Sequence, residues 1–189
     1  MEVVISNTLL QRCQDDDSRA QSELYKLLYG SLIGLCWRYS TDNEQAVEYM
    51  NLGFVRILLN IKRYKKDVPF EMWARRVMIN TIINEFKKNK NWNEKSIRGK
   101  DLRAIEERDD HALSEYQSEL IEIIKRKALM LPPMTLKVFN LYAIDGYSHN
   151  EISNLLGISE GTSAWHFSEA KKRIRQMIGV SRNQKENEQ

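Results

Sequence analysis

The sequence predicts an all-α protein: two small helical domains joined by a flexible acidic linker, the second with a helix-turn-helix. Three observations indicate this architecture. The 189 residues include only 8 Gly and 3 Pro, and Leu, Ile, Lys and Glu are frequent, as is typical of helical proteins. Apolar residues recur at helical spacing, and no segment shows a strand signal. A polar stretch without apolar periodicity separates the two periodic parts of the chain.

The domain bounds follow from where this periodicity starts and stops. Residues 1–90 form the expected N-terminal domain, and residues 91–112 form the linker. Residues 113–182 form the second domain. Residues 183–189 form a polar tail that we expect to be unordered.

Three amphipathic helices are expected in the N-terminal domain. Ser18 with Gln21 marks the start of the first, and Thr41 with Glu44 marks the start of the second. Pro69 suits the first turn of the third helix, because its missing N–H costs nothing there. The expected core side chains are, helix by helix, Leu24, Leu27, Leu28, Leu32 and Leu35; Val47, Met50, Phe54, Ile57 and Leu58; and Phe70, Trp73, Ala74, Val77 and Thr81.

The second domain should begin with two helices, at about 114–130 and 134–145. Pro132-Pro133 breaks the chain between them, and Gly146 ends the second. A motif of two capped helices follows: Ser148 with Glu151 forms a capping box, and Gly157 permits a tight turn. Together these signals predict a DNA-binding helix-turn-helix, although a generic helical hairpin would use the same caps.

The last helix of this motif begins after the cap residue Ser159 and should run to about residue 178. Its inward face is expected to hold Phe167, Ala170, Ile174, Met177 and Ile178. The side chains expected to face away, and to enter the major groove, are Thr162, Trp165, Ser168, Glu169 and Lys172. Phosphate contacts are expected from Lys171, Lys172, Arg173 and Arg175. For Trp165 two interpretations stay open: it packs on thymine methyls or sugars, or it is buried against the first domain.

Charge is segregated along the chain. Residues 62–100 hold twelve Lys and Arg against four Asp and Glu, and residues 101–124 hold eight acids against two bases. A solvated helix face would explain any one such block. The order of basic block, acidic connector and basic helix-turn-helix instead favours an extended polyanion as the partner.

The third expected helix carries a polar edge beside its apolar stripe. That edge consists of Arg76, Asn80, Asn84, Lys87 and Lys88, and Asn and Arg are base-reading side chains. Just before the helix, Lys62-Arg63-Tyr64-Lys65-Lys66 places an aromatic ring among bases, a mixture that suits single-stranded DNA. Phe70 and Trp73 are better interpreted as core anchors, because they lie in the apolar stripe.

Several classes of protein are disfavoured by what the sequence lacks. No segment is apolar enough to cross a membrane and no signal peptide is evident, so we expect a cytoplasmic protein without membrane insertion. Cys13 and Cys36 are expected to be buried thiols, and His111, His149 and His166 do not cluster, so neither a metal nor another cofactor is expected. No catalytic arrangement of side chains is evident, which argues against an enzyme.

Several motifs follow one another along the chain: the segment from Asp42 to Arg56, then Pro69-Phe70-x-x-Trp73-x-x-Arg76-x-x-x-Asn80-x-x-x-Asn84, Leu131-Pro132-Pro133 and Ser159-Glu160-Gly161-Thr162. Taken in this order, they resemble the small extracytoplasmic-function (ECF, group IV) sigma factors of the sigma-70 family of bacterial RNA polymerase. The resemblance covers nearly the whole chain. It implies a sigma factor that binds core RNA polymerase and directs promoter-specific transcription initiation. Promoter DNA would be bound both as duplex and as melted single strand, and an anti-sigma factor would be a further partner.

The resemblance also assigns roles to residues. The first domain binds the polymerase clamp and melts the minus-ten element, and the second reads the minus-thirty-five element. The clamp-binding positions are Glu48, Asn51, Leu52, Phe54 and Arg56. The minus-ten positions are Arg76, Asn80, Asn84, Lys87 and Lys88, with a base-capturing loop from Lys62 to Asp67 that includes Arg63, Tyr64, Lys65 and Lys66. The minus-thirty-five positions are Thr162, Ser163, Ala164, Trp165, Ser168, Glu169, Lys172 and Arg173.

Three of these positions depart from the family pattern. Leu52 stands where the family usually has an acid, so polymerase binding should depend less on charge. Ala164 and Glu169 stand where the family often has bases, so the preferred minus-thirty-five sequence should differ, and Glu169 could accept a hydrogen bond from cytosine.

Two other functions stay open at this point. One is a stand-alone helix-turn-helix regulator that binds DNA as a dimer and needs no polymerase for recognition. The other is an adaptor that docks onto another protein through exposed aromatic side chains and binds no DNA.

Overall fold

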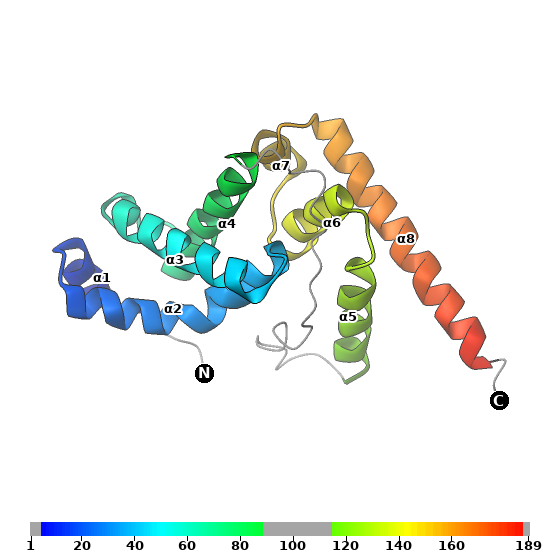
Figure 1. Cartoon of the computed structure of the whole chain (residues 1–189), viewed down its shortest axis with the longest axis horizontal. Helices are drawn as coiled ribbons and strands as arrows, with labels where there is room; N and C mark the ends of the chain where they lie inside the picture. Colours follow the sequence, from blue (N-terminus) through cyan, green and yellow to red (C-terminus); the bar gives the residue numbers. More distant parts are fainter. Residues whose placement is uncertain (1–4, 89–114, 187–189) are drawn as a thin grey trace. The chain divides into compact units, whose positions relative to one another are not determined.

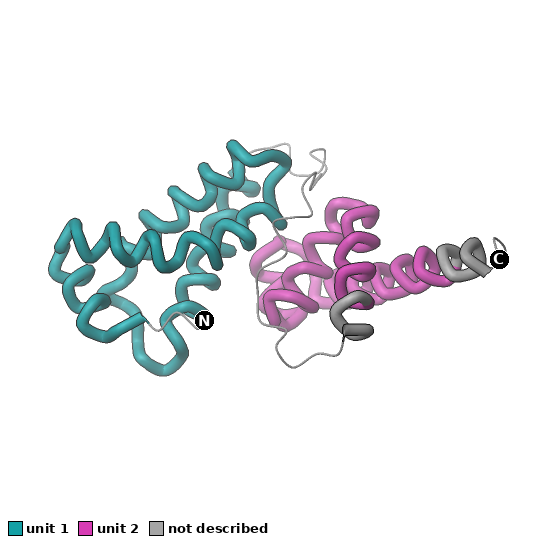
Figure 2. The backbone as a smooth tube through the Cα atoms, turned by 90° about the horizontal axis from the view of Figure 1, so that it is seen from below, with its two compact units in different colours: residues 1–92, 103–107 teal, residues 93–102, 108–189 magenta. Residues whose placement is uncertain are grey.

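The computed structural model of the chain describes residues 5–88 and 115–186, in which all regular secondary structure is helical and no strand occurs. Figure 1 shows the helices in chain order, and Figure 2 shows the two compact units into which the chain divides. Unit 1 here means residues 5–88, and unit 2 means residues 115–186. The predicted all-α class is confirmed. The predicted linker, residues 91–112, lies outside the described residues.

Unit 1 contains four helices and one short turn of 3₁₀ helix. They are α1 (Asn7–Gln14), α2 (Ser18–Tyr39), α3 (Asn43–Asn60), η1 (Ile61–Arg63) and α4 (Phe70–Lys88). The three helices expected from periodicity are α2, α3 and α4, and these pack on one another. Their shared core includes Leu24, Leu28, Leu32, Leu35, Met50, Ile57, Met78 and Ile82, all of which are fully buried.

The helix caps of α2 and α3 lie one residue away from the predicted positions. The carboxylate of Asp17, not the hydroxyl of Ser18, accepts hydrogen bonds from the backbone N–H groups of Arg19 (2.9 Å) and Ala20 (3.2 Å). Asp42, not Thr41, caps α3. In both cases a carboxylate stands next to the hydroxyl, and its negative charge interacts favourably with the positive end of the helix dipole. Pro69 lies just before α4 rather than within its first turn.

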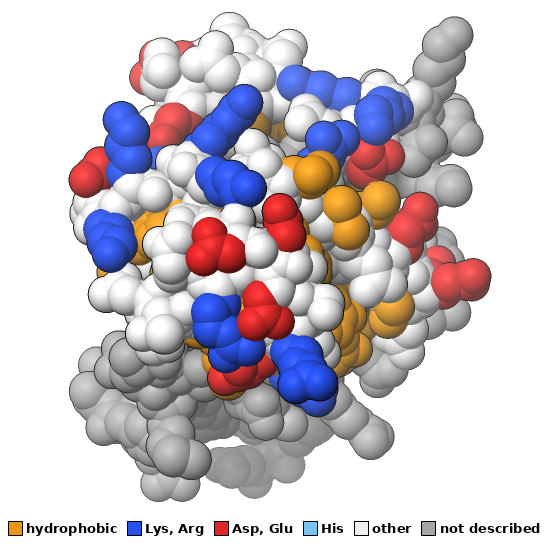
Figure 3. All heavy atoms as spheres, turned by 90° about the vertical axis from the view of Figure 1, so that its left-hand side faces the viewer, with side chains coloured by type: hydrophobic (Ala, Val, Ile, Leu, Met, Phe, Trp, Pro, Cys, Tyr) orange, Lys and Arg blue, Asp and Glu red, His pale blue; other side chains and the backbone are white. Residues whose placement is uncertain are grey.

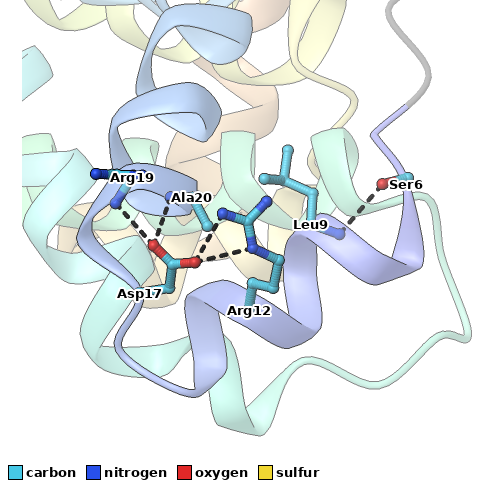
Figure 4. Close-up of polar contacts among 6 residues, drawn as sticks. All are labelled: Ser6, Leu9, Arg12, Asp17, Arg19 and Ala20. Carbon is cyan, nitrogen blue, oxygen red and sulfur yellow. Dashed lines mark hydrogen bonds and ion pairs between the residues drawn. The ribbon is translucent and has the colours of Figure 1, made fainter.

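Helix α1 was not predicted. Ser6 caps it by accepting a hydrogen bond from the Leu9 N–H (3.1 Å), and its residues Leu9, Leu10 and Cys13 are buried. Arg12 of α1 forms an ion pair with the Asp17 carboxylate (2.7 Å), so the same carboxylate both caps α2 and holds α1 (Figure 4).

A second contact of α1 lies next to the segment 62–67, the predicted DNA-binding loop. Gln14 Nε2, in the last turn of α1, donates to the Ile61 carbonyl (3.1 Å) at the start of η1. Helix α1 therefore supports the end of α3, from which the basic segment Lys62–Lys66 departs.

The buried faces of α3 and α4 differ in part from the prediction. Val47 is exposed, and Leu58 is half-buried. On α4, Met78, Ile79, Ile82 and Ile83 are buried in addition to most of the predicted stripe. The close approach of the two helices depends on Gly53 of α3, because a Cβ there would overlap the side chain of Met78.

Unit 2 consists of α5 (Glu115–Ala128), α6 (Pro133–Phe139), the π-helical turn η3 (Asn140–Ile144), α7 (His149–Leu156) and α8 (Glu160–Glu186). Gly146 adopts a positive φ of 74° after η3, as its predicted role as a stop requires. The core consists of Ala128, Leu131, Leu136, Phe139, Ala170 and Ile174, with Phe167, Met177 and Ile178 packed against it.

Helix α8 is longer than predicted. It continues past residue 178 to Glu186, so residues 183–186 are helical rather than part of an unordered tail. Gly179 interrupts the periodicity, but the residues after it include the good helix formers Arg, Gln, Lys and Glu and no proline, so nothing stops the helix there.

Candidate nucleic-acid interface

The predicted helix-turn-helix is present in unit 2 as α7 and α8. Ser148 and Glu151 form the reciprocal capping box: the Ser148 Oγ accepts from the Glu151 N–H (3.2 Å), and the Glu151 carboxylate accepts from the Ser148 N–H (2.9 Å). Gly157 ends α7 in the left-handed conformation, with φ of 68°. Ser159 caps α8 by accepting from the Thr162 N–H (3.0 Å).

A part-buried polar contact fixes α7 against α8. His149 Nδ1 lies 3.0 Å from the Ser163 Oγ, and Ser163 is fully buried. The His149 ring stacks on Tyr142 of η3, with ring centres 4.3 Å apart, and Tyr142 also contacts Phe167 at 4.3 Å. This cluster holds the two helices of the motif in a fixed relation.

Ser163 is one of the predicted minus-thirty-five positions, but its side chain is buried and is not presented to a duplex. Positions 163, 167, 170 and 174 recur at steps of four, three and four, so Ser163 lies on the inward face of α8 with Phe167, Ala170 and Ile174. Its hydroxyl tolerates burial because His149 provides a hydrogen-bond partner.

The outward face of α8 carries most of the other predicted minus-thirty-five positions. Thr162, Trp165, Ser168, Lys172 and Arg173 are exposed, whereas Ala164 and Glu169 are half-buried. Arg173 Nε donates to the Glu169 carboxylate at 2.7 Å, and this hydrogen bond is the main reason that the pKa of Glu169 lies below its usual value. Glu169 is therefore charged at neutral pH and is held by its neighbour one turn along the helix.

In unit 1 the predicted polar edge of α4 is exposed along its whole length. Arg76, Asn80, Asn84, Lys87 and Lys88 all present their side chains to solvent, beside the buried face that packs on α2 and α3. Lys88 Nζ lies 2.7 Å from the carboxylate of Glu85. The edge thus combines amide and guanidinium groups with a cationic end.

The basic segment Lys62–Lys66 begins within η1 and leads to the turn before α4. Lys62, Arg63, Lys65 and Lys66 are exposed, as expected for phosphate contacts. Tyr64 differs: it is half-buried, and its hydroxyl donates to the Val68 carbonyl (2.7 Å). Its ring packs against Phe70 and Trp73, with centres 5.1 and 5.4 Å away.

Tyr64 is therefore part of an aromatic cluster that shapes the segment, and it offers less ring surface to a base than the sequence suggested. Phe70 is buried and Trp73 is half-buried, which confirms Phe70 as a core anchor.

The predicted polymerase-binding positions lie on α3. Glu48, Asn51, Leu52 and Arg56 are exposed. Phe54 is buried, with its ring edge-on to Tyr25 of α2 at 4.9 Å, so it lies beneath this surface rather than on it.

The sequence analysis missed two exposed apolar residues on the same helix. Val55 is 53% exposed and Leu59 is 68% exposed, and with Leu52 they follow one another at steps of three and four. Such spacing places the three side chains along one face of α3, and we call them the apolar row. On the face drawn in Figure 3, apolar side chains likewise lie among exposed basic and acidic ones.

Within the described residues, no three His, Cys, Asp or Glu side chains are arranged to hold a metal ion. None of the helices in residues 5–88 and 115–186 is long and apolar enough to cross a membrane. Cys13 and Cys36 are buried free thiols, as predicted, and burial raises the pKa of Cys36 to about 12.

Comparison with known families matches each unit separately. Residues 24–91 match Sigma-70 region 2, and residues 121–174 match Sigma-70 region 4. The ECF RNA polymerase sigma factor SigW of Bacillus subtilis is 24% identical over 185 residues, which cover 94% of this chain and 98% of SigW. The RNA polymerase sigma-H factor of Pseudomonas aeruginosa is 23% identical over 163 residues, which cover 82% of this chain and 83% of that factor.

A solved structure has a similar fold. It is the sigma factor RpoE of Bartonella quintana in complex with the anti-sigma factor NepR, with a TM-score of 0.51 and 16% identity, covering 84% of this chain and 96% of that one. The two matched family regions span well over half of the chain, and they fall in the two units that carry the polar edge of α4 and the helix-turn-helix. The chain belongs to the sigma-70 family and is an ECF RNA polymerase sigma factor.

Proposed function

We propose that the two units divide promoter recognition between them. Unit 1 docks on core polymerase through α3 and reads the opened minus-ten element through α4. Unit 2 reads the minus-thirty-five element as duplex through α8. The observation that carries this division is the polar edge of α4, which exposes base-reading groups along a helix whose opposite face is buried in the core.

At the minus-ten element, Arg76, Asn80 and Asn84 contact base edges, and Lys87 and Lys88 contact phosphates. The lysines and Arg63 of the basic segment 62–66 hold the backbone of the displaced strand. Extruding a base costs a few kcal/mol, which stacking and loop contacts must offset. Tyr64 contributes by shaping the segment, because its hydroxyl and ring are engaged with Val68, Phe70 and Trp73.

At the polymerase, the apolar row of Leu52, Val55 and Leu59 forms the centre of the contact, with Glu48 and Arg56 beside it. Apolar contacts do not weaken as salt rises, whereas contacts between exposed charges do. Polymerase binding by this chain is therefore less salt-sensitive than binding through an acidic residue at position 52 would be.

At the minus-thirty-five element, Lys172 and Arg173 contact phosphates, and Trp165 and Ser168 face the base edges from the exposed side of α8. The protein performs no catalysis itself and acts in the cytoplasm with the polymerase. An anti-sigma factor that covers one of these surfaces would inhibit it. The stand-alone regulator has no support among the relatives.

The experiment that tests this proposal is transcription in vitro from a promoter library by core RNA polymerase, with and without the protein. We expect new transcripts that depend on the protein and share two sequence elements. Asn80→Ala should weaken selection at one minus-ten position by about 1–3 kcal/mol, whereas Asn43→Ala, an exposed amide at the start of α3, should change nothing. Equal promoter selection by both variants would count against the assignment of α4.

A further inference from the structure

The polar side chains near the start of α8 are largely engaged within the protein. Ser163 is buried against His149, and the Thr162 hydroxyl lies 2.8 Å from that of the cap residue Ser159. The Glu169 carboxylate is held by Arg173 at 2.7 Å. Hydrogen-bonded readout of bases by the first turns of this helix is therefore limited.

Trp165, in contrast, is 60% exposed on the same turns of the helix. Tryptophan is among the more buried residue types on average, so this exposure is unusual. Among the described side chains of α7 and α8, it is the only exposed large apolar one.

The Trp165 ring is also held in place from one side. It packs edge-on against His166, with ring centres 4.9 Å apart and planes at 71°. His166 Nδ1 lies 3.1 Å from the hydroxyl of Thr135, a buried residue of α6. Burial lowers the pKa of His166, so the imidazole beside Trp165 is neutral at neutral pH. A braced, exposed aromatic ring can bind with little loss of conformational entropy.

The major groove offers one apolar group to such a ring, the C5-methyl of thymine. In a helix-turn-helix, base edges are contacted by the N-terminal part of the recognition helix, and Trp165 lies in the second turn after the Ser159 cap. We propose that Trp165 reads thymine 5-methyl groups in the minus-thirty-five element, so that this chain selects its duplex element in part by apolar contact. The inference rests on the proposed role of unit 2 in reading duplex DNA.

A protein partner is the other class of molecule that an exposed Trp could contact. Among the side chains of unit 2 whose burial the structure describes, the other exposed large apolar ones are Met130, Tyr142 and Ile144, which lie after α5 and in η3 rather than on the outward face of α8. On that face the neighbours of Trp165 are Ser168 and Lys172, which suit DNA better than an apolar protein surface.

The test replaces thymine by uracil, which removes only the methyl group. A promoter selected from the library is prepared with deoxyuridine at each minus-thirty-five thymine in turn, on either strand, and competes against the unmodified promoter for polymerase holoenzyme. Loss of one buried methyl should weaken binding about fourfold at one or two positions. Trp165→Ala holoenzyme should bind the thymine and uracil promoters equally. Trp165→Phe should keep part of the difference, and Met130→Ala, an exposed apolar residue elsewhere in unit 2, should keep all of it.

Three results would overturn the inference while leaving the sigma-factor role intact. The wild-type holoenzyme could bind the thymine and uracil promoters equally, or the selected minus-thirty-five element could contain no thymine on either strand. The difference in affinity between the two promoters could also persist in the Trp165→Ala holoenzyme. A Trp165→Ala defect of the same size on both promoters would also overturn the inference, because Trp165 would then contact a group other than the thymine methyl. Absence of any selective transcript would overturn the proposed function together with the inference.

Discussion

Truncating Leu59 should weaken binding to core polymerase, because this residue is the most exposed member of the apolar row on α3. Burying a whole leucine side chain contributes about 1.5–3 kcal/mol. Leu59 is 68% exposed in the free protein, so about two-thirds of that, roughly 1–2 kcal/mol, remains to be gained on docking. Leu59→Ala keeps only the Cβ of the side chain and should lose about 1 kcal/mol of binding free energy, which is roughly a fivefold increase in Kd for core polymerase.

The assay is a titration of fluorescently labelled protein with core polymerase at about 0.1 M and about 1 M NaCl, over which the Debye length falls from about 10 to about 3 Å. We expect the Leu59→Ala defect to be the same at both salt concentrations. Arg56→Ala should show a smaller defect that disappears at high salt. Met72→Ala serves as the matched control, because Met72 is 56% exposed but lies on α4. Wild-type affinity in Leu59→Ala, or a defect that appears only at low salt, would refute an apolar polymerase contact.

Three further predictions concern the fold. The Gly53→Ala variant gains about 1 kcal/mol of helix propensity, but its new Cβ overlaps Met78, and this overpacking should cost about 1–3 kcal/mol of folding stability. Urea unfolding should therefore show that Gly53→Ala destabilises the protein. The control Gly30→Ala, with no atom within 4 Å of the added Cβ, should stabilise it. Ser163→Ala removes the hydrogen-bond partner of His149 and should lower the stability of unit 2 by about 1–3 kcal/mol. Promoter preference in the library assay should stay the same, and a changed preference would indicate that Ser163 contacts a base. The pKa of Asp17 is lowered, chiefly by its hydrogen bond with Arg12. The stability that the charged Asp17 contributes to the fold is therefore present above its unfolded-state pKa and is lost as pH falls through its folded-state pKa. Asp17→Asn should make the free energy of unfolding fall less steeply at acid pH, and an unchanged acid dependence would contradict this role.

The features that the sequence predicted best are those determined by neighbouring residues. The capping box of Ser148 and Glu151 and the left-handed Gly157 need only a few residues of context, and all are present as predicted. The polar edge of α4 was predicted for a similar reason, since Arg76, Asn80 and Asn84 follow one another on a single helix.

The features that the sequence did not predict depend on contacts between elements distant in the sequence. A serine at position 163 is expected to face solvent, but the hydrogen bond with His149 of α7 allows it to be buried. Phe54 matches a contact position of the family, but Tyr25 of α2 covers it. Helix α1 has only eight residues, too few for a clear periodic signal, and its burial depends on its packing on α2.

Helix α1 has a practical consequence for anyone who shortens this protein. The Sigma-70 region 2 match begins at residue 24, so a chain trimmed to the family boundary would start inside α2 and lack α1 entirely. It would lose the Asp17 cap, leave bare the apolar surface that Leu9, Leu10 and Cys13 cover, and release the Ile61 carbonyl from Gln14. Such a fragment would aggregate more readily and would hold the basic segment 62–66 less firmly, so biochemical work on the isolated domain should begin no later than Ser6.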